Sequence, residues 1–293
     1  MNNIIIFGGT GFIGRSLVKK ISNNKSKLKI MTHLKENENN NNKFQGNILN
    51  KKSFEKQITD NDIIINLIGQ YNDDILNFIE LNMKGGINLL ESCVKKKNVR
   101  VILISSVNVY EENLKKPSKE TDNPVPKTTY GKIKLLTEQL YKIYSETYDL
   151  DVTILRLGNI YGYDKKGGII SNILKSIKNK KPITITHNGN QIRDYLFIDD
   201  AVEGIVSAIK YKKKGFNIFN IASGKKCSTK KIIKNIEKQF GAEILIKTVK
   251  EEPDEKCIWA DILKTKRILK FEAKTDIEIG IKRIKDQTGK NLK

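Results

Sequence analysis

The sequence predicts an α/β fold, a doubly wound parallel sheet with a smaller C-terminal lobe. Apolar segments without polar alternation, the first at residues 4–7, indicate strands buried on both faces, as in a parallel sheet. They alternate with helical patterns through the first half of the chain, and short connections make such strands parallel with right-handed crossovers. Beyond Gly162 the alternation gives way to mixed, shorter elements. We expect one domain over residues 1–161 and a lobe over 162–293, with a strand near 216–221 returning to the first domain.

Each expected element of the first domain has its own pattern. Continuous apolar runs predict the strands, and apolar residues spaced by three and four predict the helices, as Ile75, Phe78, Ile79 and Met83 do for the longest one. The expected strands are residues 4–7, 28–32, 62–69, 99–105 and 151–157, and the expected helices are 12–21, 75–94 and 130–148. In the lobe we expect helices at 169–177, from 199, at 228–240 and at 261–269, and strands at 183–186, 193–198 and 216–221.

Three glycines spaced by three residues separate the first strand from the first helix. Gly8 permits a sharp turn, Gly11 lets a pyrophosphate approach the backbone, and Gly14 lets the helix pack tightly on the strand. The free N–H groups at the start of the helix, which begins at Phe12 and Ile13, then meet the phosphates. A strand before this motif and a helix after it are the context of a Rossmann-type dinucleotide site, and we expect one here.

Composition excludes several classes of function. The formal net charge is +21, but only six of the 54 basic residues are arginine and the 48 lysines are scattered, so we expect no specific nucleic-acid binding. No apolar run approaches the ~18 residues of a membrane span, and the first strand leaves no room for a signal peptide, so a cytoplasmic location is expected. Three widely separated cysteines predict neither disulfides nor a metal site.

A serine, a tyrosine and a lysine form the constellation that can carry chemistry. Ser106 follows a strand end, and Tyr130 and Lys134 lie four residues apart, on one face of the predicted helix. A lysine ammonium beside a phenol favours the phenolate, so we expect Lys134 to lower the pKa of Tyr130. Such a tyrosine can exchange a proton with an alcohol or carbonyl while a hydride moves at the same carbon. Ser106 would hold that oxygen.

These motifs together resemble the extended short-chain dehydrogenase/reductases, in particular the nucleotide-sugar epimerase/dehydratase branch, over nearly the whole chain. The similar segments are Gly8 to Gly14, Asn82 with the run Leu89-Leu90-Glu91, Ser105 to Tyr110, Tyr130 to Lys134, Leu155 to Gly162, and Gly189 to Asp200. The resemblance implies Ser106, Tyr130 and Lys134 as catalytic residues and a homodimer that pairs helices 75–94 and 130–148.

The resemblance also implies the binding residues. The cofactor would contact Gly8, Gly11, Phe12, Ile13, Gly14, Thr32, His33, Asn47, Ile48, Leu67, Ile68, Gly69, Asn82, Tyr130 and Lys134. The substrate would contact Asn159, Arg193, Lys250 and Asp254. Thr32 and His33 stand where NAD-binding folds usually carry an acid, and Asn47 stands where the family often has an aspartate that reads the adenine. Lys250 lies where the family often has a phosphate-binding arginine.

The expected activity is therefore an NAD-dependent epimerase that transiently oxidises C4 of a nucleoside-diphosphate sugar, with NADP not excluded as cofactor. Dehydratases of this branch place an acidic pair after the catalytic hydroxyl, whereas Val107 and Asn108 stand here, so dehydration is not expected. One alternative is an NADPH-dependent reductase of a nucleotide keto-sugar. Another is a non-catalytic NAD(P)-binding subunit, which would have no reason to keep the serine, tyrosine and lysine together.

Overall fold

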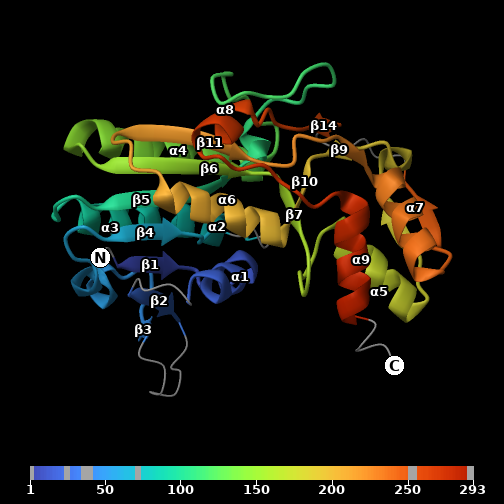
Figure 1. Cartoon of the computed structure of the whole chain (residues 1–293), viewed down its shortest axis with the longest axis horizontal. Helices are drawn as coiled ribbons and strands as arrows, with labels where there is room; N and C mark the ends of the chain where they lie inside the picture. The colour runs from blue at the N-terminus through green and yellow to red at the C-terminus, as the bar shows by residue number, and fades with distance from the viewer. Residues whose placement is uncertain (1–2, 23–26, 34–41, 70–73, 250–255, 289–293) are drawn as a thin grey trace.

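A parallel sheet forms the centre of the computed structural model, which describes residues 3–22, 27–33, 42–69, 74–249 and 256–288 (Figure 1). Its seven strands run in the order β3-β2-β1-β4-β5-β6-β11, and all neighbours are parallel. Their bounds are β1 Ile4–Phe7, β2 Leu28–Thr32, β3 Lys43–Gln45, β4 Ile63–Asn66, β5 Arg100–Ser106, β6 Asp151–Leu157 and β11 Phe216–Ile221. The predicted fold class, a doubly wound Rossmann-type sheet, is confirmed.

Helices cover both faces of the sheet (Figure 1). On one face lie α1 (Phe12–Ile21) and α6 (Ile198–Lys210), which pack against each other. The other face carries α2 (Ile75–Asn82), α3 (Lys84–Cys93) and α4 (Thr129–Tyr148). Strand residues alternate between two apolar cores: Ile4 and Ile6 belong to the core under α1 and α6, whereas Ile5 and Phe7 belong to the core under α3 and α4. Burial on both faces explains why these strands are continuously apolar.

The single helix predicted over residues 75–94 is two helices. The break falls at Met83, where the Asn82 side-chain amide donates a hydrogen bond to the Phe78 carbonyl at 2.7 Å. A side chain that competes for a helical carbonyl is a known cause of such breaks. Apolar spacing alone could not reveal it, because the pattern continues in phase across Met83.

The C-terminal lobe lies beyond the carboxyl ends of the sheet strands (Figure 1). Its helices are α5 (Ile169–Asn179), α7 (Thr229–Phe240) and α9 (Ile277–Thr288), and its strands are β7 (Asn159–Tyr161), β8 (Ile183–Ile185), β9 (Ile192–Arg193), β10 (Tyr195–Phe197), β12 (Cys227–Ser228), β13 (Ile246–Thr248) and β14 (Cys257–Ile258). Helix α8 (Leu263–Ile268) packs on β11. Short 3-10 turns occur at Lys51–Ser53, Glu55–Gln57, Val107–Val109 and His187–Gly189.

Asp194 divides the strand predicted at residues 193–198 into β9 and β10. Its buried carboxylate accepts hydrogen bonds from the backbone N–H groups of Ser223 and Gly224 at 2.8 and 2.9 Å and from the Ser223 hydroxyl at 2.6 Å. Its own carbonyl accepts from the Asn159 N–H at 2.7 Å. This residue therefore ties the lobe to the turns that follow β6 and β11.

Helix α6 connects the lobe to the edge strand. It begins after β10 and runs antiparallel to the strands towards the start of β11 (Figure 1). At its far end Arg100, the first residue of β5, donates hydrogen bonds to the carbonyls of Ile209, at 2.8 Å, and Tyr211. These are among the last carbonyls of the helix, which lack partners within it. Arg100 thus fixes the end of α6 against the sheet.

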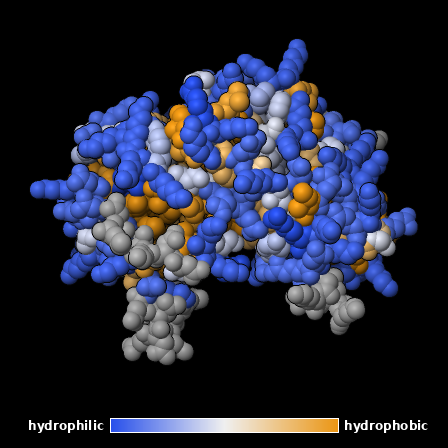
Figure 2. All heavy atoms as spheres, in the orientation of Figure 1, coloured by the Kyte–Doolittle hydropathy of each residue, from blue (hydrophilic) through white to orange (hydrophobic). Residues whose placement is uncertain are grey.

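The surface is predominantly hydrophilic, as the face in Figure 2 shows, with separate small apolar areas. Across the described part of the chain, no helix combines the length and apolar character needed to cross a membrane.

Candidate active site

The carboxyl end of β5 places Ser106 at the edge of the sheet nearest the lobe. Ser106 is buried and pairs in register with Leu157, two residues before Asn159. Its hydroxyl accepts a hydrogen bond from the Asn108 N–H at 3.2 Å, which starts the following 3-10 turn. The serine predicted from the sequence therefore lies at the ligand-binding edge of an open α/β sheet.

Tyr130 and Lys134 lie one turn apart in α4. The helix begins after Thr128, whose hydroxyl accepts from the Gly131 N–H at 3.1 Å. A side chain at position 131 would collide with the carbonyl oxygen of Asn108, so a glycine is required there. This close approach brings the start of α4 against the turn after Ser106, and the Ser106 side chain lies near enough to the Tyr130 phenol to act on its pKa.

The electrostatics of Tyr130 differ from the expectation. Burial raises the pKa of Tyr130, and the nearby Ser106 side chain only partly opposes this effect. The prediction that this pKa is lowered was therefore wrong. The phenol stacks on the Phe78 ring, with centroids 5.6 Å apart, and the Lys134 ammonium lies 5.9 Å from the same ring. Lys134 directs its hydrogen bonds elsewhere.

Lys134 is only 4% exposed and contacts two other predicted site residues. Its Nζ lies 3.4 Å from both Asn82 Oδ1 and the Ile104 carbonyl. Gly69, with φ of 121°, packs so closely on Asn82 and Lys134 that a Cβ there would overlap both side chains. Burial lowers the pKa of Lys134 to about 8, although the Glu138 carboxylate acts in the opposite direction. The Lys134 ammonium therefore loses its proton at a lower pH than an exposed lysine does.

The glycine-rich turn has the shape that a pyrophosphate requires. Gly8 has φ of 83°, and a side chain on Gly14 would collide with the Gly8 carbonyl, so α1 packs directly on the turn. Gly11 caps α1 without any side chain. The first N–H groups of a helix have no carbonyl partner within it, and here they belong to Phe12, Ile13 and Gly14. This bare backbone with positive helix dipole fits the phosphates of a dinucleotide.

The other predicted cofactor residues surround that turn at the carboxyl ends of neighbouring strands. Thr32 ends β2 and is buried, whereas His33 beside it is exposed. Asn47 is exposed after β3, and its Oδ1 accepts from the Leu49 N–H at 2.9 Å. Ile48 is fully buried, and the half-buried Leu67 and Ile68 follow β4.

Two of the predicted substrate residues lie where the lobe joins the sheet. Asn159 starts β7 and is opposite Tyr195 in β10. Arg193 ends β9, and its Nη1 donates to the Ile192 carbonyl at 2.9 Å. The neighbouring Asp194 carboxylate accepts hydrogen bonds from the backbone N–H groups of Ser223 and Gly224. Lys250 and Asp254 lie outside the described residues.

A buried ion pair one helical turn beyond Lys134 was not predicted from the sequence. Arg156 in β6 forms an ion pair with Glu138 in α4, with Nη2 and Oε2 2.6 Å apart, and both side chains are less than 5% exposed. An arginine inside the apolar run of β6 was a signal, because buried charges are almost always paired. Glu138, four residues after Lys134, was the partner to look for.

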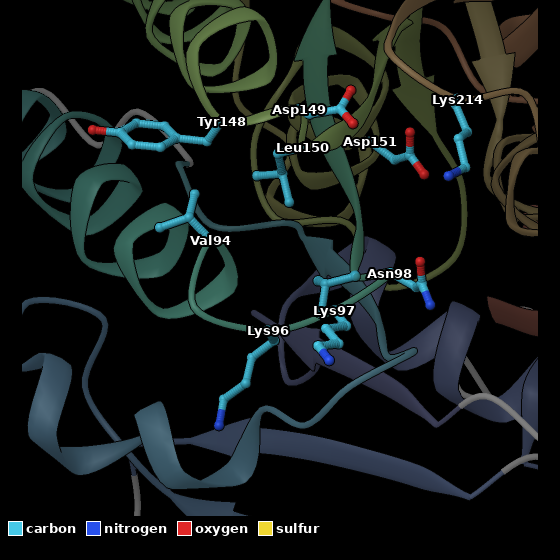
Figure 3. Close-up of a pocket in the computed structure, with 10 residues that line it drawn as sticks. Val94, Lys96, Lys97, Asn98, Tyr148, Asp149, Leu150, Asp151 and Lys214 are labelled. Atoms are coloured by element: carbon cyan, nitrogen blue, oxygen red, sulfur yellow. The ribbon is translucent and has the colours of Figure 1, made fainter.

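Other features of the surface have no part in this site. Figure 3 shows a hollow of about 280 Å³ that includes Lys97, Tyr148 and Lys214 in its lining. It lies at the amino-terminal ends of β5 and β6, opposite to Ser106. Among the described residues, no group of three or more His, Cys, Asp or Glu side chains is placed to hold a metal ion.

Comparisons with known proteins show the family of this chain. The model of the NAD dependent epimerase/dehydratase family matches residues 4–222. The chain belongs to this family. A Methanocaldococcus jannaschii protein named "Putative UDP-glucose 4-epimerase" is 30% identical over 96% of each chain. The UDP-glucuronic acid 4-epimerase of Bacillus cereus, solved with UDP-glucuronic acid and NAD, is 26% identical, with a TM-score of 0.87 over 99% of this chain and all of that one.

A relative named for another activity is also similar to this chain. UDP-glucuronic acid decarboxylase 6 of Arabidopsis thaliana is 24% identical and covers 95% of this chain and 86% of its own length. Membership of the family therefore does not identify the reaction, which depends on the residues of the site.

Proposed function

We propose that this protein is an NAD-dependent 4-epimerase of a nucleoside-diphosphate sugar. The observation that carries the proposal is the convergence of Ser106, Tyr130 and Lys134 at the carboxyl end of β5, beside the glycine-rich turn of β1 and α1. A non-catalytic dinucleotide-binding subunit has no need of that convergence. The uridine sugars and NAD named for the relatives support the substrate class and the cofactor.

The residues of the site divide the work of a reversible oxidation. The glycine-rich turn would hold NAD, which would supply the acceptor for a hydride from C4 of the sugar and the donor for its return to the opposite face. Tyr130 takes the proton of the C4 hydroxyl at its phenol oxygen and gives it back, while Ser106 holds the same sugar oxygen by a hydrogen bond. The Lys134 ammonium stabilises the phenolate that forms. Because both hydride and proton return, the cofactor is regenerated in every cycle.

The substrate would be held through its diphosphate. The planar guanidinium of Arg193 can bind two phosphate oxygens at once. Asn159 lies where β6 continues into the lobe, two residues after the partner of Ser106 and opposite Tyr195. Remote binding of this kind fixes the nucleotide while the sugar ring stays free to turn. Turning the 4-keto sugar is what epimerisation requires, because the hydride must return to the other face.

The test is product analysis with purified protein. We expect NAD to be released on denaturation and identified by mass spectrometry. UDP-glucose, UDP-galactose and UDP-glucuronic acid, with GDP- and dTDP-sugars beside them, are then incubated in D₂O without added cofactor. Epimerisation should give the C4 epimer of at least one sugar with no deuterium at C4. A need for stoichiometric NADPH would indicate the reductase, released CO₂ a decarboxylase, and no conversion of any sugar would contradict the proposal.

We also propose that two copies pair through α2, α3 and α4. These helices expose large apolar side chains on the face of the sheet away from α6: Ile75, Leu76, Ile79, Ile87, Leu136, Ile143 and Tyr148, from 39% to 77% exposed. Several large exposed apolar side chains on one layer favour an interaction surface, and a twofold dimer would cover both copies of it. Light scattering should give twice the chain mass at micromolar concentration, and a monomer would contradict this pairing.

A further inference from the structure

We propose that the buried pair of Glu138 and Arg156 is a positioning device for the reaction: it keeps Lys134 protonated and holds Tyr130 in register with Ser106. The inference rests on the proposed function, in which Lys134 and Tyr130 act on the substrate. Neither Glu138 nor Arg156 has a role in the proton and hydride transfers described above.

The contacts of Glu138 join three elements of the site. Its carboxylate accepts two hydrogen bonds at 3.1 Å from Nε of Arg156 and one at 2.6 Å from Nη2, which is a forked pair between α4 and β6. It also accepts a hydrogen bond from the hydroxyl of Ser105 in β5, the residue before Ser106. Because Glu138 follows Tyr130 by eight residues on the same helix, this anchor fixes how far α4 lies along β5. The spacing of Tyr130 from Ser106 follows from it.

Arg156 is also linked through Tyr110 to the edge strand β11. The guanidinium of Arg156 lies 4.7 Å from the centre of the Tyr110 ring, and the Tyr110 hydroxyl donates to Asn220 Oδ1 in β11 at 2.7 Å. Asn220 in turn donates to the carbonyls of Ser118 and Asp261 at 3.0 Å. Tyr110 carries no charge here, since burial raises its pKa to about 12. It therefore offers a matched change in the same network that leaves the charges intact.

Lys134 needs an anion because it is taken out of water. An ammonium that is 4% exposed loses its proton readily, and the Asn82 and Ile104 oxygens near it are neutral. Among the described residues, Tyr130 and Glu138 lie one turn to either side of Lys134 on the same face of α4. Glu138 is the anion of the two, and its charge acts on the pKa of Lys134. Its field favours the charged form of Lys134.

The sign of the expected effect follows from these charges. Removing the negative charge of Glu138 makes the Lys134 ammonium easier to deprotonate, and the Arg156 cation left behind acts in the same direction. Turnover that depends on protonated Lys134 is then lost at lower pH. We expect the alkaline limb of the kcat profile to move down by about one pH unit in Glu138→Gln, with little change in KM for the sugar nucleotide.

Three variants test this in the full-length protein. Glu138→Gln removes the anion alone. Because an unpaired buried arginine can prevent folding, the double variant Glu138→Gln with Arg156→Met removes both charges. Tyr110→Phe is the control, which breaks the bond to Asn220 without altering a charge. Thermal unfolding and NAD binding check that each variant is folded. The alkaline limb should move down in the double variant, and further in Glu138→Gln, while Tyr110→Phe keeps the wild-type limb.

A second measurement does not depend on turnover. Protein labelled with ¹³C at the lysine ε-carbon is titrated by NMR, and Lys134→Met identifies the Lys134 signal. Its midpoint should fall in both Glu138 variants and stay in Tyr110→Phe. If no sugar nucleotide reacts but the midpoint moves, the proposed epimerase function fails while Glu138 still holds the charge of Lys134. A wild-type midpoint and a wild-type limb in the double variant would overturn the inference.

Discussion

The sheet and the lobe hold their polar groups in different ways. Under the sheet, the carboxylate of Glu138 is held by the side chains of Arg156 and Ser105, two residues on separate strands. In the lobe, the carboxylate of Asp194 is held chiefly by backbone N–H groups at Ser223 and Gly224. The first arrangement depends on the identity of distant partners, and the second on the path of the backbone. We therefore expect substitutions on the sheet side to lower turnover, and substitutions in the lobe to change the shape of the substrate site.

The largest effect is expected on the sheet side, from Tyr130→Phe. Only the hydroxyl that transfers the proton is lost, so turnover should fall by ~10²–10⁴ while NAD binding is retained. Tyr144→Phe, in the same helix, removes a hydroxyl that donates to Glu91 at 2.7 Å and serves as the matched control. Steady-state kinetics and a cofactor titration of both variants make the measurement.

The outcome separates mechanism from packing. Tyr144→Phe should keep turnover within a few-fold of wild type. If Tyr130→Phe also turned over at a near-native rate, Tyr130 would have no part in the proton transfer, and the two regions would not differ as proposed.

A smaller effect is expected from Asp194→Asn in the lobe. The amide cannot accept all the hydrogen bonds from Ser223 and Gly224, and its NH₂ group faces donors, so the free energy of unfolding should fall by about 2–3 kcal/mol. Asp199→Asn is the control, because Asp199 is half exposed and pairs loosely with Arg283 at 3.5 Å. Urea unfolding of the two variants gives the comparison. Equal stability losses would mean that Asp194 does not anchor the lobe.

The smallest of the three effects is expected from Arg193→Lys. The charge remains but the fork is lost, so affinity for the nucleotide sugar should fall about tenfold to a hundredfold while NAD binding is unchanged. Arg283→Lys, in α9, controls for the loss of a guanidinium elsewhere in the lobe. Calorimetric titration with the sugar nucleotide that the wild type accepts decides the matter. Unchanged affinity would remove Arg193 from the substrate site.

The difference between the regions also explains what the sequence could predict. The motif residues on the sheet side stand at fixed spacings within single elements, as Tyr130 and Lys134 do in α4, and the strands of the first domain are recognisable as unbroken apolar runs. The residues of β11 were also predicted as a strand of this sheet, and they pair with β6.

What escaped prediction depends on contacts between distant segments. The pair of Glu138 and Arg156 forms only when α4 lies on β6, and the division of β9 from β10 arises because Asp194 turns to the backbone of Ser223. The pKa of Tyr130 was misjudged because helical spacing does not reveal Phe78, which stacks on the phenol. The short strand β3 has too few residues to show a pattern, and the final helix α9 was not predicted although Ile277, Ile281 and Ile284 stand at helical spacing.

Helix α6 has a mechanical consequence for the site. Its 13 residues span roughly 20 Å. The helix begins directly after the lobe strand β10, and it ends where Arg100 donates hydrogen bonds to the carbonyls of Ile209 and Tyr211. Its start comes shortly after Arg193 and Asp194. Its last turn is held at the amino-terminal end of β5, whereas Ser106 lies at the carboxyl end of that strand. The position of Arg193 and Asp194 relative to the sheet is thus set partly by a contact at the opposite end of α6.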